Sequence, residues 1–252
     1  MKFDAEKETK KIIQFIKEYF QNNHLKGIVI GISGGKDSAV AAAIFTKALG
    51  KENVIGVTLP CHSKEEDKID ALKIADFYGF NCINLDLTNT YDTFQKEINK
   101  LGNFTEKEKE NSDINIKPRL RMTSLYYIAA LYTEINHGTY IVSGNGNKCE
   151  EFVGYFTKGG DSVSDIKVLS DLTVDEVIKI GEYLNVPKEI LYKSPNDGIS
   201  GKTDEEKLGV TYSDITKYIN HEDLSLELAK KIEILHKKNQ HKFYIPTYQK
   251  QK

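Results

Sequence analysis

Residues 27–38 read GIVIGISGGKDS, and this stretch decides the fold. Residues 27–32 are apolar and rich in β-branched side chains, which is typical of a strand buried on both faces, as in a parallel sheet. The polar residues that follow form a turn, and residues 39–49 have the composition of a helix that ends at Gly50. We therefore expect a buried strand, a glycine-rich turn and a helix in direct succession.

Apolar periodicity on both sides of this stretch predicts the same alternation. Helices are expected over residues 4–22, 64–78, 89–101 and 119–136, and strands over residues 54–59, 81–85 and 139–143. Strands and helices that alternate with short turns indicate an α/β fold with a doubly wound parallel sheet and right-handed crossovers. The last hundred residues offer helices near 173–184, 211–220 and 225–238 but no convincing strand, so we expect C-terminal helical additions to one domain spanning residues 1–252.

Two polar stretches interrupt this pattern. Residues 102–117 are highly charged with little apolar periodicity, and residues 194–204 are dense in Gly, Ser, Asp and Pro, which predicts two loops. Long loops inside an α/β domain often act as lids or binding segments. A solvated surface excursion is the alternative for each.

Composition excludes several classes of protein. The formal net charge of −2 over 252 residues does not favour nucleic-acid binding, so any phosphate must be met by a local site. The longest apolar run, residues 39–45, is far shorter than the roughly 20 residues that cross a bilayer. The three cysteines, Cys61, Cys82 and Cys149, are widely spaced and form no CxxC pair. We expect a cytoplasmic protein that binds neither nucleic acid nor membranes.

Residues 31–38, which we call the glycine loop, have the composition of a phosphate site. Adjacent glycines let backbone amides approach an anion, and the start of a helix adds unpaired N–H groups and the positive end of a dipole. The loop is not a Walker P-loop, because Asp37 stands where Ser or Thr should follow the lysine. An acidic residue beside phosphates favours an intervening Mg²⁺. The alternative is a tight turn with a helix cap.

Arginine is scarce in this chain. Of the 35 basic residues only Arg119 and Arg121 are arginine, and they lie two residues apart. Two arginines at this one place indicate that the site requires planar side chains that donate two parallel hydrogen bonds at once, which lysine cannot do. The alternative is coincidence in a lysine-rich composition.

The loop SGGKDS after the first strand resembles the pyrophosphate loop of the N-type ATP pyrophosphatases, which have a Rossmann-like fold of the adenine nucleotide alpha hydrolase type. Nearly the whole chain resembles one family in that group, the ammonia-dependent NAD synthetases. The segments that carry this resemblance are KPRLRM at 117–122, SGNGNKCE at 143–150, VGYFTKGGD at 153–161, Asp165-Ile166, KTDEEKLG at 202–209, His241-Lys242 and Pro246.

The resemblance implies roles for the residues at matching positions. Mg²⁺ would be held by Asp37 and Glu150. ATP, the co-substrate, would be bound by Gly31, Ile32, Ser33, Gly34, Gly35, Lys36, Asp37 and Ser38, with Asn145 and Asn196. Deamido-NAD would be bound by Arg121, Arg119, Lys158, Asp165, His241 and Lys242. The catalytic residues would be Asp161, which positions or deprotonates the incoming ammonium, with Lys158 and Asp37.

Three residues depart from the family pattern. Asn145 and Asn196 stand where a hydroxyl residue is usual, and an amide can replace a hydroxyl as donor and acceptor. Val174 stands where a lysine usually approaches ATP, and it cannot replace a cation. We expect either that a neighbouring lysine such as Lys179 compensates or that ATP affinity is lower.

The resemblance implies ATP-dependent amidation of deamido-NAD to NAD through an adenylated intermediate, in a homodimer. Ammonia is the expected nitrogen source, because the whole chain is used without a second, glutaminase domain. Two alternatives stay open. One is another amidating or thiolating ATP pyrophosphatase, which the absence of CxxC pairs disfavours for thiolation. The other is a noncatalytic adenine-nucleotide-binding module, which Val174 favours and the joint presence of Asp37, Glu150, Lys158 and Asp161 disfavours.

Overall fold

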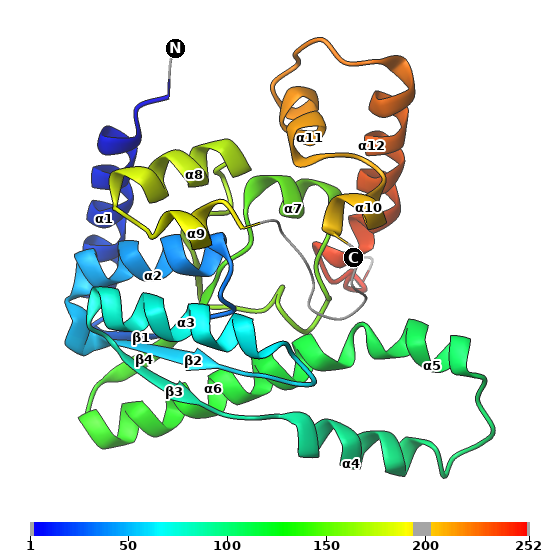
Figure 1. The fold of residues 1–252 in the computed structure, drawn as a ribbon, viewed down its shortest axis with the longest axis horizontal. Coiled ribbons are helices and arrows are strands. Elements are labelled where there is room, and N and C mark those ends of the chain that lie inside the picture. Colours follow the sequence, from blue (N-terminus) through cyan, green and yellow to red (C-terminus); the bar gives the residue numbers. More distant parts are fainter. Residues whose placement is uncertain (1–2, 194–202, 251–252) are drawn as a thin grey trace.

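The computed structural model describes residues 3–193 and 203–250. Within them lies one five-stranded parallel sheet in the order β3-β2-β1-β4-β5 (Figure 1). The strands are β1 Leu25–Gly31, β2 Val54–Thr58, β3 Asn81–Asn84, β4 Thr139–Gly144 and β5 Ile166–Lys167. The chain runs outward from β1 to β3 and then returns to β4, so the topological switch point lies between β1 and β4. The expected doubly wound α/β fold is confirmed.

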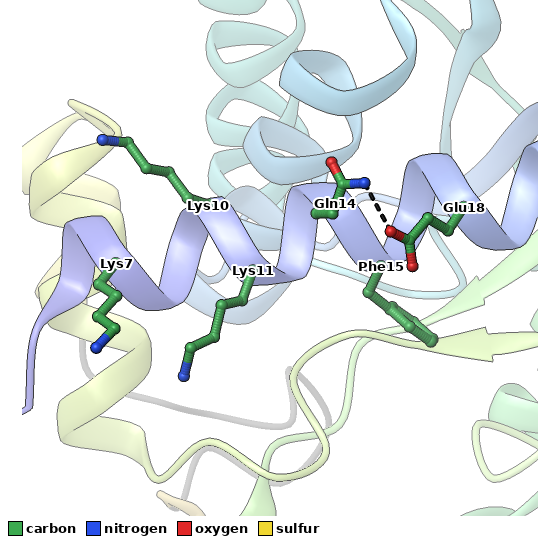
Figure 2. A pocket seen from close by; sticks show the side chains of 6 residues that line it. All are labelled: Lys7, Lys10, Lys11, Gln14, Phe15 and Glu18. Atoms are coloured by element: carbon green, nitrogen blue, oxygen red, sulfur yellow. Dashed lines mark hydrogen bonds between the residues drawn. The ribbon is translucent and has the colours of Figure 1, made fainter.

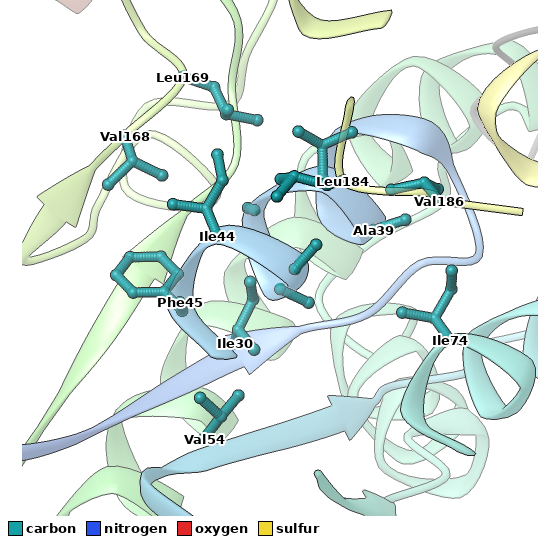
Figure 3. Close-up of a cluster of buried hydrophobic side chains, with 14 of the residues drawn as sticks. Ile30, Ala39, Ile44, Phe45, Val54, Ile74, Val168, Leu169, Leu184 and Val186 are labelled. Carbon is teal, nitrogen blue, oxygen red and sulfur yellow. The ribbon is translucent and has the colours of Figure 1, made fainter. Parts of the chain in front are cut away.

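One face of the sheet carries the largest apolar cluster. The helices that cover it are α1 Ala5–Asn22, α2 Lys36–Leu49, α3 Glu65–Tyr78, α8 Val174–Tyr183 and α9 Lys188–Leu191. Figure 3 shows Ile30 of β1 beneath Ile44 and Phe45 of α2, and all three are fully buried. Because side chains alternate across a strand, Ile28 and Ile30 belong to this cluster.

The opposite face is covered by α6 Ile116–Asn136. Val29 of β1 and Val142 of β4 pack here with Ile128 and Ala129 of the helix. The sheet is thus buried on both sides, which explains why the strands are continuously apolar. The helices α4 Thr88–Ile98 and α5 Glu106–Asp113 extend from this side of the molecule, to the right in Figure 1.

The C-terminal third builds a separate apolar cluster beyond the carboxyl ends of the strands. Its helices are α7 Lys148–Val153, α10 Asp204–Leu208, α11 Tyr212–Ile219 and α12 Leu226–Asn239. Two 3₁₀ turns complete the described elements, η1 Lys51–Asn53 and η2 Gln240–Lys242. The expected C-terminal helical additions are confirmed.

Two expectations about elements were wrong. The C-terminal part does contain a strand, since Ile166 and Lys167 pair with Ser143 and Gly144 of β4. Residues 102–117 are not a simple loop, because they contain α5. A capping box starts this helix, with the Thr105 hydroxyl accepting from the Glu108 N–H and the Glu108 carboxylate accepting from the Thr105 N–H.

The second expected loop, residues 194–204, lies mostly outside the described residues, as does Asn196. Within the two described ranges, no helix combines the length and apolarity needed to span a bilayer.

Candidate active site

The glycine loop lies at the carboxyl end of β1 and leads directly into α2. Gly34 has a φ of +78°, and a Cβ at this position would collide with the backbone carbonyl of Asp67 in α3. Gly35 is the N-cap of α2, with an ordinary φ of −96°. The first N–H groups of α2 have no acceptor within the helix, so the loop presents donors and a positive dipole end where an anion can approach.

The two serines of the loop brace it internally. The Ser33 and Ser38 hydroxyl oxygens lie 3.1 Å apart, and Ser38 Oγ donates to the Gly35 carbonyl at 3.0 Å. The Asn145 side-chain amide donates to the Gly31 carbonyl at 2.9 Å. Asn145 therefore fixes the start of the loop from β4, the strand next to β1.

Asp37 and Glu150 are brought together although 113 positions separate them in the chain. Asn147, which is fully buried, joins them: its side-chain amide donates to Asp37 Oδ1 at 3.4 Å, and its backbone N–H donates to Glu150 Oε2 at 3.1 Å. Burial first, and then the nearby charge of Asp37, raise the pKa of the Glu150 carboxyl. Two acidic side chains held by the same buried asparagine form a candidate metal site.

The donor set of this pair fits Mg²⁺. Magnesium is usually held by one or two carboxylates together with phosphate oxygens and water, rather than by a complete protein cage. No group of three or more His, Cys, Asp or Glu side chains arranged to hold a metal occurs in residues 3–193 and 203–250. A metal bound by Asp37 and Glu150 would therefore need ligands from the nucleotide and from water.

A third carboxylate, which the sequence analysis did not single out, stands beside this pair. Asp204 is 8% exposed and accepts from the Tyr155 hydroxyl at 3.0 Å and from the Tyr212 hydroxyl at 3.5 Å. The Tyr212 hydroxyl also lies 3.5 Å from Glu150 Oε1. The Tyr212 hydroxyl thus links α10 to Glu150 of the candidate metal site. The pattern Thr203-x-x-Glu206 predicts the start of a helix here, but only the fold brings it to Asp37.

Lys36 points inward rather than toward the open side of the loop. Its side chain is 7% exposed, and its Nζ lies 3.2 Å from Asp37 Oδ2 and 5.7 Å from the centroid of the Tyr212 ring. Burial alone would lower the pKa of the ammonium, but the carboxylates of Asp37, Glu150 and Asp204 outweigh it, so the pKa is raised.

A second cluster joins the segment 154–162 to the C-terminal tail. Lys158 Nζ donates to the His241 carbonyl at 2.6 Å and to the Tyr244 carbonyl at 3.4 Å. In return, Lys242 Nζ donates to the carbonyls of Gly154 and Phe156 at 2.8 and 2.9 Å. The tail therefore packs against this segment, and Lys158, His241 and Lys242 lie close together.

Asp161 lies in the same segment. Its Oδ1 accepts from the Thr157 N–H at 2.8 Å, which closes a tight turn around Gly159 and Gly160. Asp161 is exposed, and partial desolvation of its carboxyl by the surrounding turn raises its pKa. Lys167 and Lys242 act in the opposite direction as nearby cations.

The two arginines connect α6 to both sides of the site. Arg119 donates through Nε and Nη2 to the Lys158 carbonyl, at 3.4 and 3.1 Å. Arg121 donates to the Leu59 carbonyl at 3.1 Å and to Ser63 Oγ at 3.4 Å. Each guanidinium thus makes two contacts, and within the described structure these contacts are to the chain itself.

Comparison with known proteins identifies the family. A model of the NAD synthase family matches residues 8–246. The chain belongs to the NAD synthase family. The NH(3)-dependent NAD(+) synthetase of Carboxydothermus hydrogenoformans is 39% identical over 248 residues, 98% of each chain.

Two solved structures show the same relationship. The NMN synthetase of Francisella tularensis has a TM-score of 0.89 and 32% identity, and the match covers 98% of this chain and 99% of that one. The NH3-dependent NAD synthetase of Campylobacter jejuni has a TM-score of 0.77 and 28% identity, over 98% and 100% of the two chains. The family and the fold that the sequence analysis expected are both confirmed.

Two further residues of this NAD synthase family member have visible structural roles. Asp165 accepts from the Val142 N–H at 2.7 Å and from the Tyr126 hydroxyl at 3.1 Å, so its carboxylate holds the β4–β5 edge against α6. Val174 is the first residue of α8 and is buried in the C-terminal apolar cluster. Compensation by Lys179 was one of two expected consequences of Val174, and the Lys179 Nζ lies 6.0 Å from the centroid of the Phe3 ring.

The cysteines and the surface hollows do not add to the site. All three thiols are free, and burial raises the pKa of each, to about 11 for Cys82, so none is an activated nucleophile. A hollow of about 480 Å³ lies along the outer side of α1, lined by Lys7, Lys10, Lys11, Gln14, Phe15 and Glu18 (Figure 2). Its lysines stand apart along one helix and converge on no common point.

Proposed function

We propose that this chain is an ammonia-dependent NAD synthetase. In this reaction ATP adenylates the carboxylate of deamido-NAD and releases pyrophosphate, and ammonia then displaces AMP to form the amide of NAD. The observation that carries the proposal is the pairing of Asp37 with Glu150 beside the glycine loop, in a chain of the NAD synthase family. We also propose that residues 1–252 act as one catalytic domain.

The glycine loop would bind the phosphates of ATP. Its backbone N–H groups and the N-terminus of α2 stabilise the negative charge that develops on the leaving pyrophosphate. Mg²⁺ held by Asp37 and Glu150 would neutralise phosphate charge and orient the phosphates for cleavage. Asn147 hydrogen-bonds to both carboxylates, and the Ser33–Ser38 contact braces the loop that would bind the phosphates.

The second cluster would bind the dinucleotide. Lys158 and Lys242 are cations whose Nζ atoms lie within 3 Å of backbone carbonyls. Both would bind an anionic substrate once these hydrogen bonds are broken. His241 and Arg119 border the same segment. Arg121 approaches from the β2 side, so deamido-NAD would lie between this cluster and the carboxyl end of the sheet.

Asp161 would position the incoming ammonium and accept its proton. Its desolvated carboxyl has a raised pKa, which makes it a better proton acceptor than an ordinary aspartate. The Thr157 N–H fixes one carboxylate oxygen and leaves the other for the nitrogen.

The assembly and location belong to the same proposal. Three apolar side chains on α6, Tyr127, Leu131 and Ile135, are 68%, 43% and 68% exposed and recur every four residues. Such a stripe on one helix face fits a homodimer interface. Three free thiols fit the reducing cytoplasm.

A second candidate acceptor follows from one comparison. The Francisella tularensis enzyme with a TM-score of 0.89 is an NMN synthetase. The same amidation, applied to nicotinate mononucleotide, would give NMN. The curated relative at 39% identity favours the dinucleotide.

The test of the proposal is to offer ATP, Mg²⁺ and ammonium with one acceptor at a time and to measure AMP. We expect AMP with deamido-NAD at a kcat/KM at least tenfold above that with nicotinate mononucleotide. The reverse preference would make the chain an NMN synthetase. ATP binding without AMP formation on either acceptor would support the noncatalytic module.

A further inference from the structure

Acidic groups from three different elements lie around the ammonium of Lys36, and an aromatic ring from a fourth element packs against it. Asp37 stands beside it on α2, Glu150 on α7 and Asp204 on α10, and the buried ring of Tyr212 on α11 lies under its ammonium. Tyr155 also faces this group through its hydrogen bond to Asp204. Within the described residues around this point, three acidic side chains thus lie near a single ammonium, and Asp37 forms the ion pair with it.

Burying the ammonium of Lys36 is unfavourable in free energy, so its inward position suggests a role inside the site. A buried lysine loses its hydration, and attraction to nearby carboxylates is what offsets this loss of free energy. A lysine that served only the phosphates of a ligand could stay hydrated on the open side of the loop. Here the ammonium lies 3.2 Å from an oxygen of Asp37, the same carboxylate that forms the candidate metal site.

We propose that Lys36 is the built-in counter-ion of the Asp37, Glu150 and Asp204 carboxylates while no nucleotide is bound, so that free Mg²⁺ binds weakly and enters together with ATP. This inference rests on the proposed function. The fixed ammonium repels a second cation placed on the same carboxylates. The charge of an arriving polyphosphate reverses this balance, because it attracts both the ammonium and the metal.

The backbone position of Lys36 permits this exchange. Lys36 is the first residue of α2, directly after the N-cap Gly35, so its Cα already lies in the phosphate-binding turn. Rotation about side-chain bonds alone can carry the ammonium from Asp37 toward a phosphate, because the long stem of lysine is flexible. The metal can then take the place beside Asp37 and Glu150.

The experiment measures Mn²⁺ binding without nucleotide, by electron paramagnetic resonance, in the wild type and in Lys36→Met. Mn²⁺ serves as the probe for Mg²⁺. We expect Lys36→Met to bind Mn²⁺ at least about tenfold more tightly than the wild type, and Lys36→Arg, which keeps the charge, to bind it weakly. Lys148→Met is the matched control: Lys148 also lies near Glu150 on α7, but it pairs with Asp171 at 2.9 Å, so its removal should leave Mn²⁺ affinity within about twofold.

A second readout is the coupling between metal and nucleotide. A nonhydrolysable ATP analogue should raise Mn²⁺ affinity strongly in the wild type and much less in Lys36→Met, because the repulsion that the nucleotide relieves is already gone. If Lys36→Met does not fold, Lys36→Gln, which keeps a donor for Asp37, is measured in its place. Equal coupling in the wild type and the neutral variant would overturn the inference.

A Glu150→Gln variant separates this inference from the proposed function. If Glu150→Gln leaves Mn²⁺ binding unchanged in the presence of the analogue, the metal site itself is wrong and both proposals fall. If Glu150→Gln weakens binding but Lys36→Met binds free Mn²⁺ no more tightly than the wild type, only the role of Lys36 is contradicted.

Discussion

At the residue scale, the two glycines of the loop have different reasons to be glycine. Gly34 combines a φ of +78° with close contact to the Asp67 carbonyl. Gly35 has an ordinary φ, and a Cβ there would have Ser33 Oγ as its nearest neighbour, at 3.4 Å. Gly34→Ala should destabilise the fold by about 2–4 kcal/mol, and Gly35→Ala by about 1 kcal/mol or less. Urea denaturation measures both, and equal losses would contradict the loop geometry.

The ionised carboxylate of Asp161 lowers the stability of the folded state at neutral pH. Because desolvation raises its folded pKa, the native state holds the proton more tightly than the unfolded chain. The native state is therefore stabilised below the ordinary aspartate pKa of about 4, and this stabilisation is lost as the pH rises through the raised value. Asp161→Asn, which keeps an acceptor for the Thr157 N–H, should raise the melting temperature at pH 7 and change it less at pH 3.5, while amidation is lost. A lower melting temperature at pH 7 would contradict this account.

At the element scale, Lys193 ties the end of α9 to the start of α3. Its Nζ lies 2.8 Å from both Asp67 Oδ1 and Asp70 Oδ2. Burial would raise the pKa of Asp70, but Lys193 and Lys73 lower it overall, so the stabilisation is present at neutral pH and lost as the pH falls through the depressed value.

Lys193→Met should therefore cost about 1–2 kcal/mol in the free energy of unfolding at pH 7 and almost nothing near pH 2. Lys73→Met is the control, since Lys73 reaches Asp70 at 3.2 Å from a half-exposed position and should cost about 0.5 kcal/mol or less. Urea denaturation at the two pH values measures both variants, and an undiminished effect of Lys193→Met in acid would refute the ion-pair explanation.

Most elements could be predicted because their signals are local. The apolar run of β1 and the helical periodicity of α1 and α6 follow from burial on one or two faces. The strand β5 could not be predicted, because two residues are too few to show an alternating apolar pattern. Its position also depends on the hydrogen bond from the Val142 N–H of β4 to Asp165. The capping pattern Thr105-x-x-Glu108 was a local signal for α5 that charge density concealed.

At the scale of the whole molecule, the stripe on α6 predicts the assembly. Ile135→Glu should weaken a homodimer at least about 100-fold, because a buried carboxylate would face an apolar partner surface. Leu226→Glu, at an 80% exposed position on α12, is the control and should leave the dimer intact. Sedimentation velocity distinguishes the two. A wild type that is monomeric at all concentrations would contradict the interface.

The candidate site was only partly predictable from the sequence. The order of the motifs along the chain identified Asp37, Glu150, Lys158 and the His241-Lys242 pair as candidate site residues. The structure brings these residues into two clusters. Asp204 and the inward turn of Lys36 could not be predicted, because they depend on α10 and α11 packing against α7 across long sequence separations. Asn145 and Asp165 hold the framework, a role that no motif reveals.

The most direct test of the account is a single stoichiometry measurement. The protein is incubated with ATP, Mg²⁺ and deamido-NAD, with ammonium or glutamine supplied separately, and NAD and AMP are quantified. The account predicts equal amounts of NAD and AMP with ammonium and neither product above background with glutamine. AMP without NAD, or no AMP under either condition, would contradict an ammonia-dependent amidation at this site.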